Sequence, residues 1–220
     1  MRASRSSGTT GLRRTAMVLL LGALIPLAAG TATEICAGQQ PSTDHNHQPH
    51  QPPPAPERYS RSIAAYAPPD VTLVDMSGAR VALRSALNYD GPVLLQFIFT
   101  TCPTICPVMS GTLSAAQDKL GPDLDKIRMI SISIDPEHDT PARLQEYAQK
   151  FKARRQWRFL TGKLEDIEAV QKAFDAYRGN KMRHEPITYL RASPDEPWVR
   201  LDGLMSATAL VAEYHQLMAR

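Results

Sequence analysis

The stretch that decides the fold is GPVLLQFIFTTCPTICP, residues 91–107. Its apolar run over 93–99 is typical of a strand buried on both faces of a sheet, and Gly91-Pro92 marks the turn before it. Cys102-Pro103 ends this strand. A helix is expected to follow, because apolar residues recur there at the spacing of one helix face: Ile105, Met109, Leu113 and Ala116.

The rest of the sequence alternates between strand and helix signals. Short apolar runs predict strands over 71–74, 81–83, 127–134, 159–160, 187–190 and 198–201. Helices are expected over 164–177, over 206–218 and from Thr140-Pro141, where threonine suits the N-cap and proline the first helical position. This alternation predicts an α/β fold in which helices flank a mixed central sheet, with a hairpin at the N-terminal end of the domain.

The first 32 residues read as an export signal or an N-terminal anchor. Basic residues end at Arg13-Arg14, an apolar run covers 16–29, and small residues follow at the place where a cleavage site needs them. A membrane-spanning helix needs roughly 20 apolar residues, so this run is short and cleavage is the preferred interpretation. The expected location is therefore periplasmic or exported, with a membrane tether at the N-terminus if the signal is retained.

Residues 33–58 are expected to form a disordered linker rich in histidine, proline and glutamine. Such a composition cannot bury enough apolar surface to become ordered. His45, His47 and His50 could collect metal weakly, but in so polar a segment the preferred interpretation is that they are merely solvated. The role of Cys36 is unexplained.

The composition leaves one globular domain, residues 59–220. Of the 220 residues, 43% are hydrophobic and 21% are charged, which is enough to form a real core. The formal net charge of +3 includes four arginines of the N-terminal signal, and without them the balance is 3 − 4 = −1. A near-neutral domain argues against nucleic-acid binding, which relies on a basic face. We expect a monomer.

Cys102 and Cys106 carry the chemistry of the domain. A thiol at the first turn of a helix meets unpaired backbone N–H groups and the positive end of the helix dipole, which stabilise the thiolate. Residues four apart lie on one helix face, so both sulfurs point to the same side. The pair could therefore chelate one metal ion or close a disulfide.

Two other interpretations of this pair are open. A small structural disulfide is the first, although closing so short a loop constrains the unfolded chain only modestly. A peroxidase of the peroxiredoxin type is the second, since it also places a cysteine after such a strand. Those enzymes have threonine three residues before the reactive cysteine, and this sequence has Phe99.

Four segments together resemble the Sco/SenC family of copper proteins: TTCPTICP at 100–107, SISIDPEHDTP at 131–141, FLTG at 159–162 and HEPITYL at 184–190. The resemblance covers residues 59–220 and implies a thioredoxin-like fold. It implies a copper ion, Cu(I) or Cu(II), bound by Cys102, Cys106 and His184. It also implies delivery of copper to the dinuclear site in subunit II of cytochrome c oxidase.

The implied ligands suit copper. Two thiolates and one imidazole form a soft set of low coordination number that favours Cu(I) and can also hold Cu(II). Zinc generally requires four protein ligands in a structural site, and no fourth is obvious. His184 precedes the strand expected over 187–190, and in a thioredoxin-like sheet that loop approaches the cysteine turn. Taken alone, His184 would be an ordinary surface or hydrogen-bonded loop histidine.

Two function classes compete with a copper chaperone. One is a thiol-disulfide oxidoreductase that reduces cysteines of a cuproprotein partner through Cys102 and Cys106. The other is a structural module with an inert disulfide. We expect a binding protein rather than an enzyme, and its partner is subunit II or another exported cuproprotein. The charged loop over 135–139 could contact that partner, although the helix start that follows it explains the loop well enough.

Overall fold

Strand β4 (Val93–Ile98) lies in the interior of an eight-stranded sheet, and all six of its residues are buried. The computed structural model describes residues 58–219, which belong to one compact unit. β4 pairs in parallel with β5 (Arg128–Ser133) and antiparallel with β7 (Ile187–Arg191), so the sheet is mixed. The order of the strands is β1-β8-β7-β4-β5-β6-β2-β3. The remaining strands are β1 (Arg58–Ala64), β2 (Thr72–Asp75), β3 (Arg80–Ala82), β6 (Trp157–Thr161) and β8 (Trp198–Leu204).

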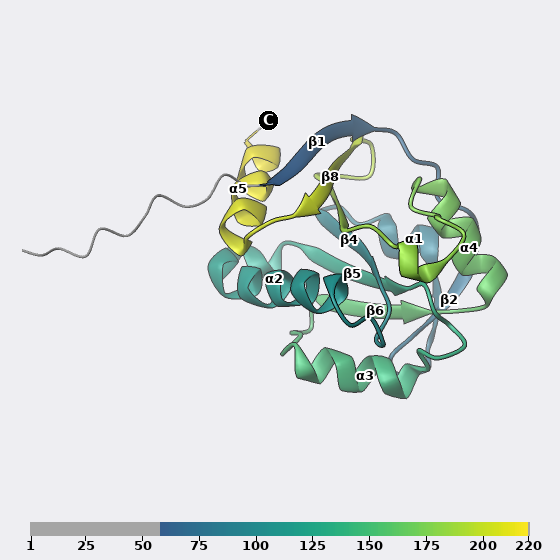
Figure 1. Cartoon of the computed structure of the whole chain (residues 1–220). Helices are drawn as coiled ribbons and strands as arrows, with labels where there is room; N and C mark the ends of the chain where they lie inside the picture. Colours follow the sequence, from purple (N-terminus) through teal and green to yellow (C-terminus); the bar gives the residue numbers. More distant parts are fainter. Residues whose placement is uncertain (1–57, 220) are drawn as a thin grey trace, which may run out of the picture. The chain divides into compact units, whose positions relative to one another are not determined.

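Helices cover the two faces of the sheet (Figure 1). α2 (Ile105–Leu120) connects β4 to β5, and α3 (Pro141–Lys150) connects β5 to β6. Both connections join parallel neighbours in the same direction along the sheet, so right-handed crossovers place the two helices on one face. A hydrogen bond of 3.0 Å between Ser110 Oγ and Tyr147 Oη joins them, and α5 (Ala207–Met218) packs against α2.

The other face is covered by α1 (Leu83–Leu87) and by the end of α4 (Leu164–Ala173). Phe174, the residue after α4, packs edge-on against Phe97 of β4 and Tyr189 of β7. Two short 3-10 helices complete the domain: η1 (Gly121–Asp125) and η2 (Lys181–Arg183).

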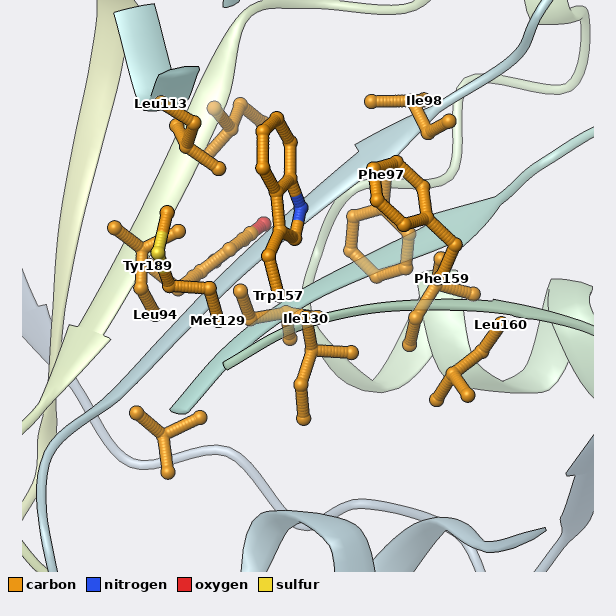
Figure 2. Close-up of a cluster of buried hydrophobic side chains, with 14 of the residues drawn as sticks. Leu94, Phe97, Ile98, Leu113, Met129, Ile130, Trp157, Phe159, Leu160 and Tyr189 are labelled. Carbon is orange, nitrogen blue, oxygen red and sulfur yellow. The ribbon is translucent and has the colours of Figure 1, made fainter. Parts of the chain in front are cut away.

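The core consists of aliphatic and aromatic side chains (Figure 2), and several polar side chains are buried among them, Ser131 in the centre of the sheet included. Ser131 Oγ, in β5, accepts hydrogen bonds from Gln96 Nε2 at 2.9 Å and from Trp157 Nε1 at 2.8 Å. These bonds join three adjacent strands, because Gln96 lies in β4 and Trp157 in β6. Hydrogen bonding reduces the cost of burying these polar groups, although Gln96 Oε1 has no hydrogen-bond partner among the described residues.

The predicted α/β architecture is confirmed, including the N-terminal hairpin, which β2 and β3 form. Thr140 caps α3 as expected: its side chain accepts a hydrogen bond from the backbone N–H of Arg143. Met109, expected in the core, is buried.

Three elements differ from the expectation. α4 ends at Ala173 rather than at residue 177, because Asp175 has a positive φ of 51°, which a helix cannot continue. Leu83, expected in a strand, begins α1. The edge strand β1 was not predicted, because its sequence RYSRSIA is mostly polar and its pairing with β8 depends on distant residues.

The predicted export signal, most of the linker, Cys36 and the three linker histidines lie outside the described residues. Within residues 58–219, no helix is both long enough and apolar enough to cross a membrane.

Two alanine substitutions test the packing at β4. A Cβ at Gly91 would lie 2.7 Å from the carbonyl oxygen of Lys126, so Gly91→Ala requires a backbone shift and should lower the free energy of unfolding by about 1–3 kcal/mol. A Cβ at Gly111, inside α2, meets nothing within 4 Å, and Gly111→Ala should stabilise by about 0.5–1 kcal/mol. Urea denaturation measures both, and equal effects of one sign would contradict the packing described.

Candidate metal centre

The turn between β4 and α2 presents the sulfur of Cys102 to the start of the helix. The backbone N–H of Cys102 donates to the carbonyl of Phe99 at 3.2 Å, which closes the turn. Thr104 is the N-cap residue of α2, but its side chain accepts no hydrogen bond from the first amides of the helix within the described residues. The amide of Cys106 instead lies 3.4 Å from Cys102 Sγ. The sulfur therefore occupies the place of a capping group.

This position changes the acidity of Cys102. Burial acts to raise the pKa of its thiol. The backbone N–H groups of Cys106, Thr104 and Ile105 and the side chain of Cys106 act in the opposite direction and outweigh burial, so the pKa lies below its ordinary value. Hydrogen bonds to a thiolate favour the charged form, which is the nucleophile and the metal ligand.

Cys106 is the opposite case. Its side chain is 0% exposed, and burial strongly raises the pKa of its thiol. The neighbouring Cys102 and Asp139 raise the pKa further, because their negative charges disfavour a second anion. Both cysteines are free thiols in the described structure. The pair thus consists of one thiol prepared to ionise and one that keeps its proton.

Asp139 holds the cysteine turn in place. This carboxylate is 0% exposed and accepts hydrogen bonds from the backbone N–H of Thr100 at 3.0 Å, from Thr100 Oγ1 and from Ser133 Oγ at 2.6 Å. Thr100 lies two residues before Cys102, and Ser133 ends β5. The sequence placed Asp139 in a charged loop but did not indicate this positioning role, which depends on a contact 39 residues away in the chain.

His184 lies at the same edge of the sheet as the cysteine turn. It directly follows η2 and precedes β7, whose pairing with β4 brings this loop to the carboxyl end of β4. His184 Nε2 is 3.0 Å from the carbonyl oxygen of Phe97, and the imidazole meets the ring of Phe99 edge-on at 6.5 Å between centroids. A carbonyl only accepts hydrogen bonds, so Nε2 carries the proton and Nδ1 keeps its lone pair.

Burial lowers the pKa of His184 to about 4, against a smaller opposing effect of the Phe97 carbonyl. The imidazole is therefore neutral at physiological pH, which is the form that binds metal ions.

Two ion pairs fix the loop that carries His184. Lys181 Nζ lies 2.6 Å from Asp135, which follows β5 and is buried, and Arg178 Nη2 lies 2.7 Å from Glu185. Asn180 caps η2 by accepting a hydrogen bond from the amide of Met182 at 2.8 Å. A cleft of about 350 Å³ opens beside this loop, with His184, Asp135 and Lys181 in its wall.

The structure brings the two cysteines together and places His184 nearby, but it does not join the three in one ligand group. Within residues 58–219, no three side chains of histidine, cysteine, aspartate or glutamate are arranged to hold a metal ion. Phe99 packs against the imidazole, and Lys181 Nζ lies 5.9 Å from the centroid of the same phenyl ring.

Comparison with known proteins identifies the fold and the family. The model of the SCO1/SenC family matches residues 65–219. The SCO1 protein homolog of Bacillus subtilis (strain 168) is 40% identical over 93 residues, which cover 41% of this chain and 47% of the relative. The chain spans about half the length of the first curated relatives it matches, 47% and 52%.

Solved structures agree with this assignment. Copper-bound ScoI of Arabidopsis thaliana superimposes with a TM-score of 0.60 at 27% identity, over 71% of this chain and 99% of that structure. BsSco, described as a member of the Sco family of cytochrome c oxidase assembly proteins with a disulfide switch, gives 0.59 at 28% identity over 71% and 95%. The expected thioredoxin-like fold is thereby confirmed.

The asymmetry of the two thiols can be measured by alkylation with iodoacetamide across pH. Only a thiolate reacts, so the rate rises with pH through the pKa of each thiol. In a Cys36→Ser background, Cys106→Ser should react with a midpoint below the ordinary thiol value of about 8.5, and Cys102→Ser with a midpoint above it. Coincident midpoints would show that the helix start does not distinguish the two sulfurs.

Asp139→Asn tests the anchor of the cysteine turn. An amide has one acceptor oxygen in place of two and no charge, so the charge-assisted bonds from Thr100 and Ser133 are lost or become neutral ones, and the variant should lower the free energy of unfolding by about 1–3 kcal/mol. Asp118→Asn is the matched control, because Asp118 is exposed and its pair with Arg154 contributes about 1 kcal/mol or less. Equal losses in urea denaturation would rule out the anchoring role.

Proposed function

Because the chain belongs to the SCO1/SenC family, we propose that it is a copper-binding protein that serves cytochrome c oxidase assembly. Copper is its cargo, held by Cys102, Cys106 and His184 and delivered to the dinuclear copper site of subunit II. The observation that carries this proposal is the paired thiols at the start of α2, one with a lowered pKa, beside a neutral imidazole at the same sheet edge.

The chemistry of these donors fits copper. The lowered pKa of Cys102 favours its thiolate form, the His184 imidazole is neutral, and soft sulfur ligands select Cu(I). Cys106 keeps its proton in the described state, but a metal ion inverts this preference, since a thiol that coordinates a metal ion is deprotonated. Loading should therefore release a proton from Cys106, which makes copper affinity increase with pH.

Coordination by all three side chains requires a local movement. His184 donates from Nε2 to the carbonyl of Phe97, so Nδ1 is the atom that can bind copper while this bond is kept. In a histidine that binds a metal ion, a hydrogen bond from the other ring nitrogen fixes the tautomer. The loop between Arg178 and Glu185 is held by surface-accessible ion pairs, which are weak enough to rearrange.

An open ligand set suits delivery. Three protein ligands leave a position at which a group of the acceptor can enter before the donor releases the ion. The acceptor is subunit II or another exported cuproprotein, and the protein works outside the cytoplasm as a monomer, with a membrane tether if its N-terminal signal is retained.

The asymmetric thiols also favour a second function, thiol-disulfide exchange with a cuproprotein partner. The Cys102 thiolate would attack a disulfide sulfur of the partner, whose S–S bond breaks as its leaving thiolate takes a proton. Cys106 would then lose its proton and attack Cys102, which releases the partner as a dithiol and leaves a Cys102–Cys106 disulfide. This step needs no histidine, so His184 separates the two functions.

Copper binding can be measured by metal analysis and optical spectroscopy of the purified protein. Every variant carries His45, His47 and His50 replaced by alanine, so that the N-terminal histidines do not contribute. The parent should hold about one copper per chain with a sulfur-to-Cu(II) charge-transfer band. Cys102→Ser and Cys106→Ser should lose the band. Removing a residue that only hydrogen-bonds a metal ligand lowers metal affinity by about 10–100-fold. Removing the ligand itself should cost no less, so His184→Ala should weaken copper binding at least tenfold.

His215→Ala is the matched control, because His215 is exposed on α5. A His184→Ala variant that binds copper like the control would remove His184 from the site. A parent protein that holds no copper, yet reduces a partner disulfide equally well with and without His184, would leave exchange as the function.

A further inference from the structure

A second pocket lies at the edge of the sheet opposite the cysteine turn. β7 runs from the His184 loop at one edge to Arg191 at the other, and Arg191 lines a pocket of about 480 Å³ together with α1. The polar side chains in its wall are Arg84, Ser85, Asn88 and Arg191, and within the described part of the chain no aspartate or glutamate lines it. The pocket is therefore rich in hydrogen-bond donors and positively charged.

Arg191 is buried, and no carboxylate of residues 58–219 lies within ion-pair distance of it. Only 8% of the residue is exposed, and the guanidinium lies 4.6 Å from the centroid of the Trp198 ring. Nη2 donates to the carbonyl of Leu87 and Nη1 to that of Pro194 at 3.4 Å, whereas Nε has no partner among residues 58–219. Asp195 attracts this charge, but it is exposed and does not come within ion-pair distance of the guanidinium.

Arg200 shows how the same chain treats another buried arginine. It is 9% exposed and pairs with Asp202, Nη1 also lying 3.4 Å from Asp175. A buried charge is costly unless it is paired, and this fold supplies the pair for Arg200. For Arg191 the described residues supply carbonyl oxygens and the face of the Trp198 ring but no carboxylate within ion-pair distance, so an anion from outside the chain could pair with it.

Arg84 adds a second cation to the pocket. Its Nε donates to the carbonyl of Pro68 at 3.1 Å, and its side chain makes no ion pair with another described residue. Ser85 and Asn88 are exposed beside it and contribute a hydroxyl and an amide. Two guanidinium groups, a hydroxyl and an amide together offer many hydrogen-bond donors. An anionic group with more oxygens than the two of a carboxylate therefore matches this pocket better.

We propose that this pocket binds the phosphoryl group of an anionic ligand between Arg84 and Arg191. Arg84, whose Nε bonds Pro68, can offer its two Nη groups to phosphate oxygens in a bidentate manner, and Arg191, whose Nε is enclosed, can add the Nη hydrogens that its carbonyl partners leave free. The pocket volume exceeds what a lone phosphate requires and falls in the range of small-molecule sites, so it accommodates a phosphate that carries an organic group. The site is separate from the cysteines and independent of copper.

The first experiment titrates the full chain with inorganic phosphate at constant ionic strength set by NaCl. NMR shifts of the amides of residues 84–88 and the melting temperature report binding. Saturable shifts and a rise in melting temperature are expected. Arg84→Gln removes charge-assisted bonds worth about 1.5–3 kcal/mol, which corresponds to roughly a tenfold or greater loss of affinity.

Asn88→Asp is the sharper variant. It keeps the shape of the side chain and places a carboxylate beside the arginines, so it should abolish phosphate binding and raise the melting temperature in the absence of phosphate. Arg143→Gln is the matched control, because Arg143 is exposed on α3, away from the pocket. The Arg143→Gln protein should bind phosphate like the parent. Arg84→Gln and Asn88→Asp proteins that bind phosphate like this control would overturn the proposal.

A second arm identifies the source of the phosphoryl group. Phosphatidylglycerol vesicles are compared with phosphatidylcholine vesicles in co-sedimentation. If the protein sediments with phosphatidylglycerol vesicles and Arg84→Gln abolishes this, the pocket binds a lipid headgroup. If the protein binds inorganic phosphate but does not sediment with these vesicles, the pocket binds a soluble phosphate. Absence of both kinds of binding overturns the proposal.

Discussion

The first-turn amides of α2 have no partner inside the helix, and the sulfur of Cys102 is the group that they surround. These amides lower the pKa of Cys102, whereas burial chiefly raises the pKa of Cys106, one turn further on, so the two cysteines are unequal. The strand before the turn must end where it does for the sulfur to reach these amides. Burial of all six residues of β4 fixes that end point.

Two acidic residues after β5 hold the two halves of the site. Asp139 fixes Thr100 in the cysteine turn, and Asp135 binds Lys181 in the loop that carries His184. Asp139 is buried and accepts three hydrogen bonds, whereas Asp135 is bonded to Lys181, whose side chain is 41% exposed. The cysteine turn is therefore held by more bonds than the histidine loop. This difference fits the local movement of the histidine loop that the proposed coordination requires.

The distribution of charge separates this edge of the sheet from the opposite one. At the edge that carries the cysteine turn and His184, each charged group discussed meets a counter-charge or a hydrogen bond within the chain. At the other edge, Arg191 and Arg84 lie in one pocket without an acid among the described lining residues. Arg200 is also buried, yet it is paired with Asp202. Burial of an arginine in this fold is therefore compatible with a counter-charge from the chain.

Local patterns in the sequence were enough to predict several elements. The apolar run over 93–99 and the Thr140-Pro141 helix start depend on neighbours in the chain, and both appeared where expected. Cys102 was expected on one helix face with Cys106, but it precedes α2 and meets Cys106 at the start of that helix. The sequence also indicated which residues carry the chemistry, although the joint role of Cys102, Cys106 and His184 remains a proposal.

Contacts between distant residues could be read from the three-dimensional arrangement alone. The hydrogen bond from His184 to Phe97 spans 87 residues and that from Thr100 to Asp139 spans 39, and no periodicity encodes either pair. The early end of α4, the strand β1 and the lack of a counter-ion for Arg191 within residues 58–219 likewise follow from backbone conformation, pairing and packing. Such features arise from the arrangement of several elements in space, which short-range patterns do not specify.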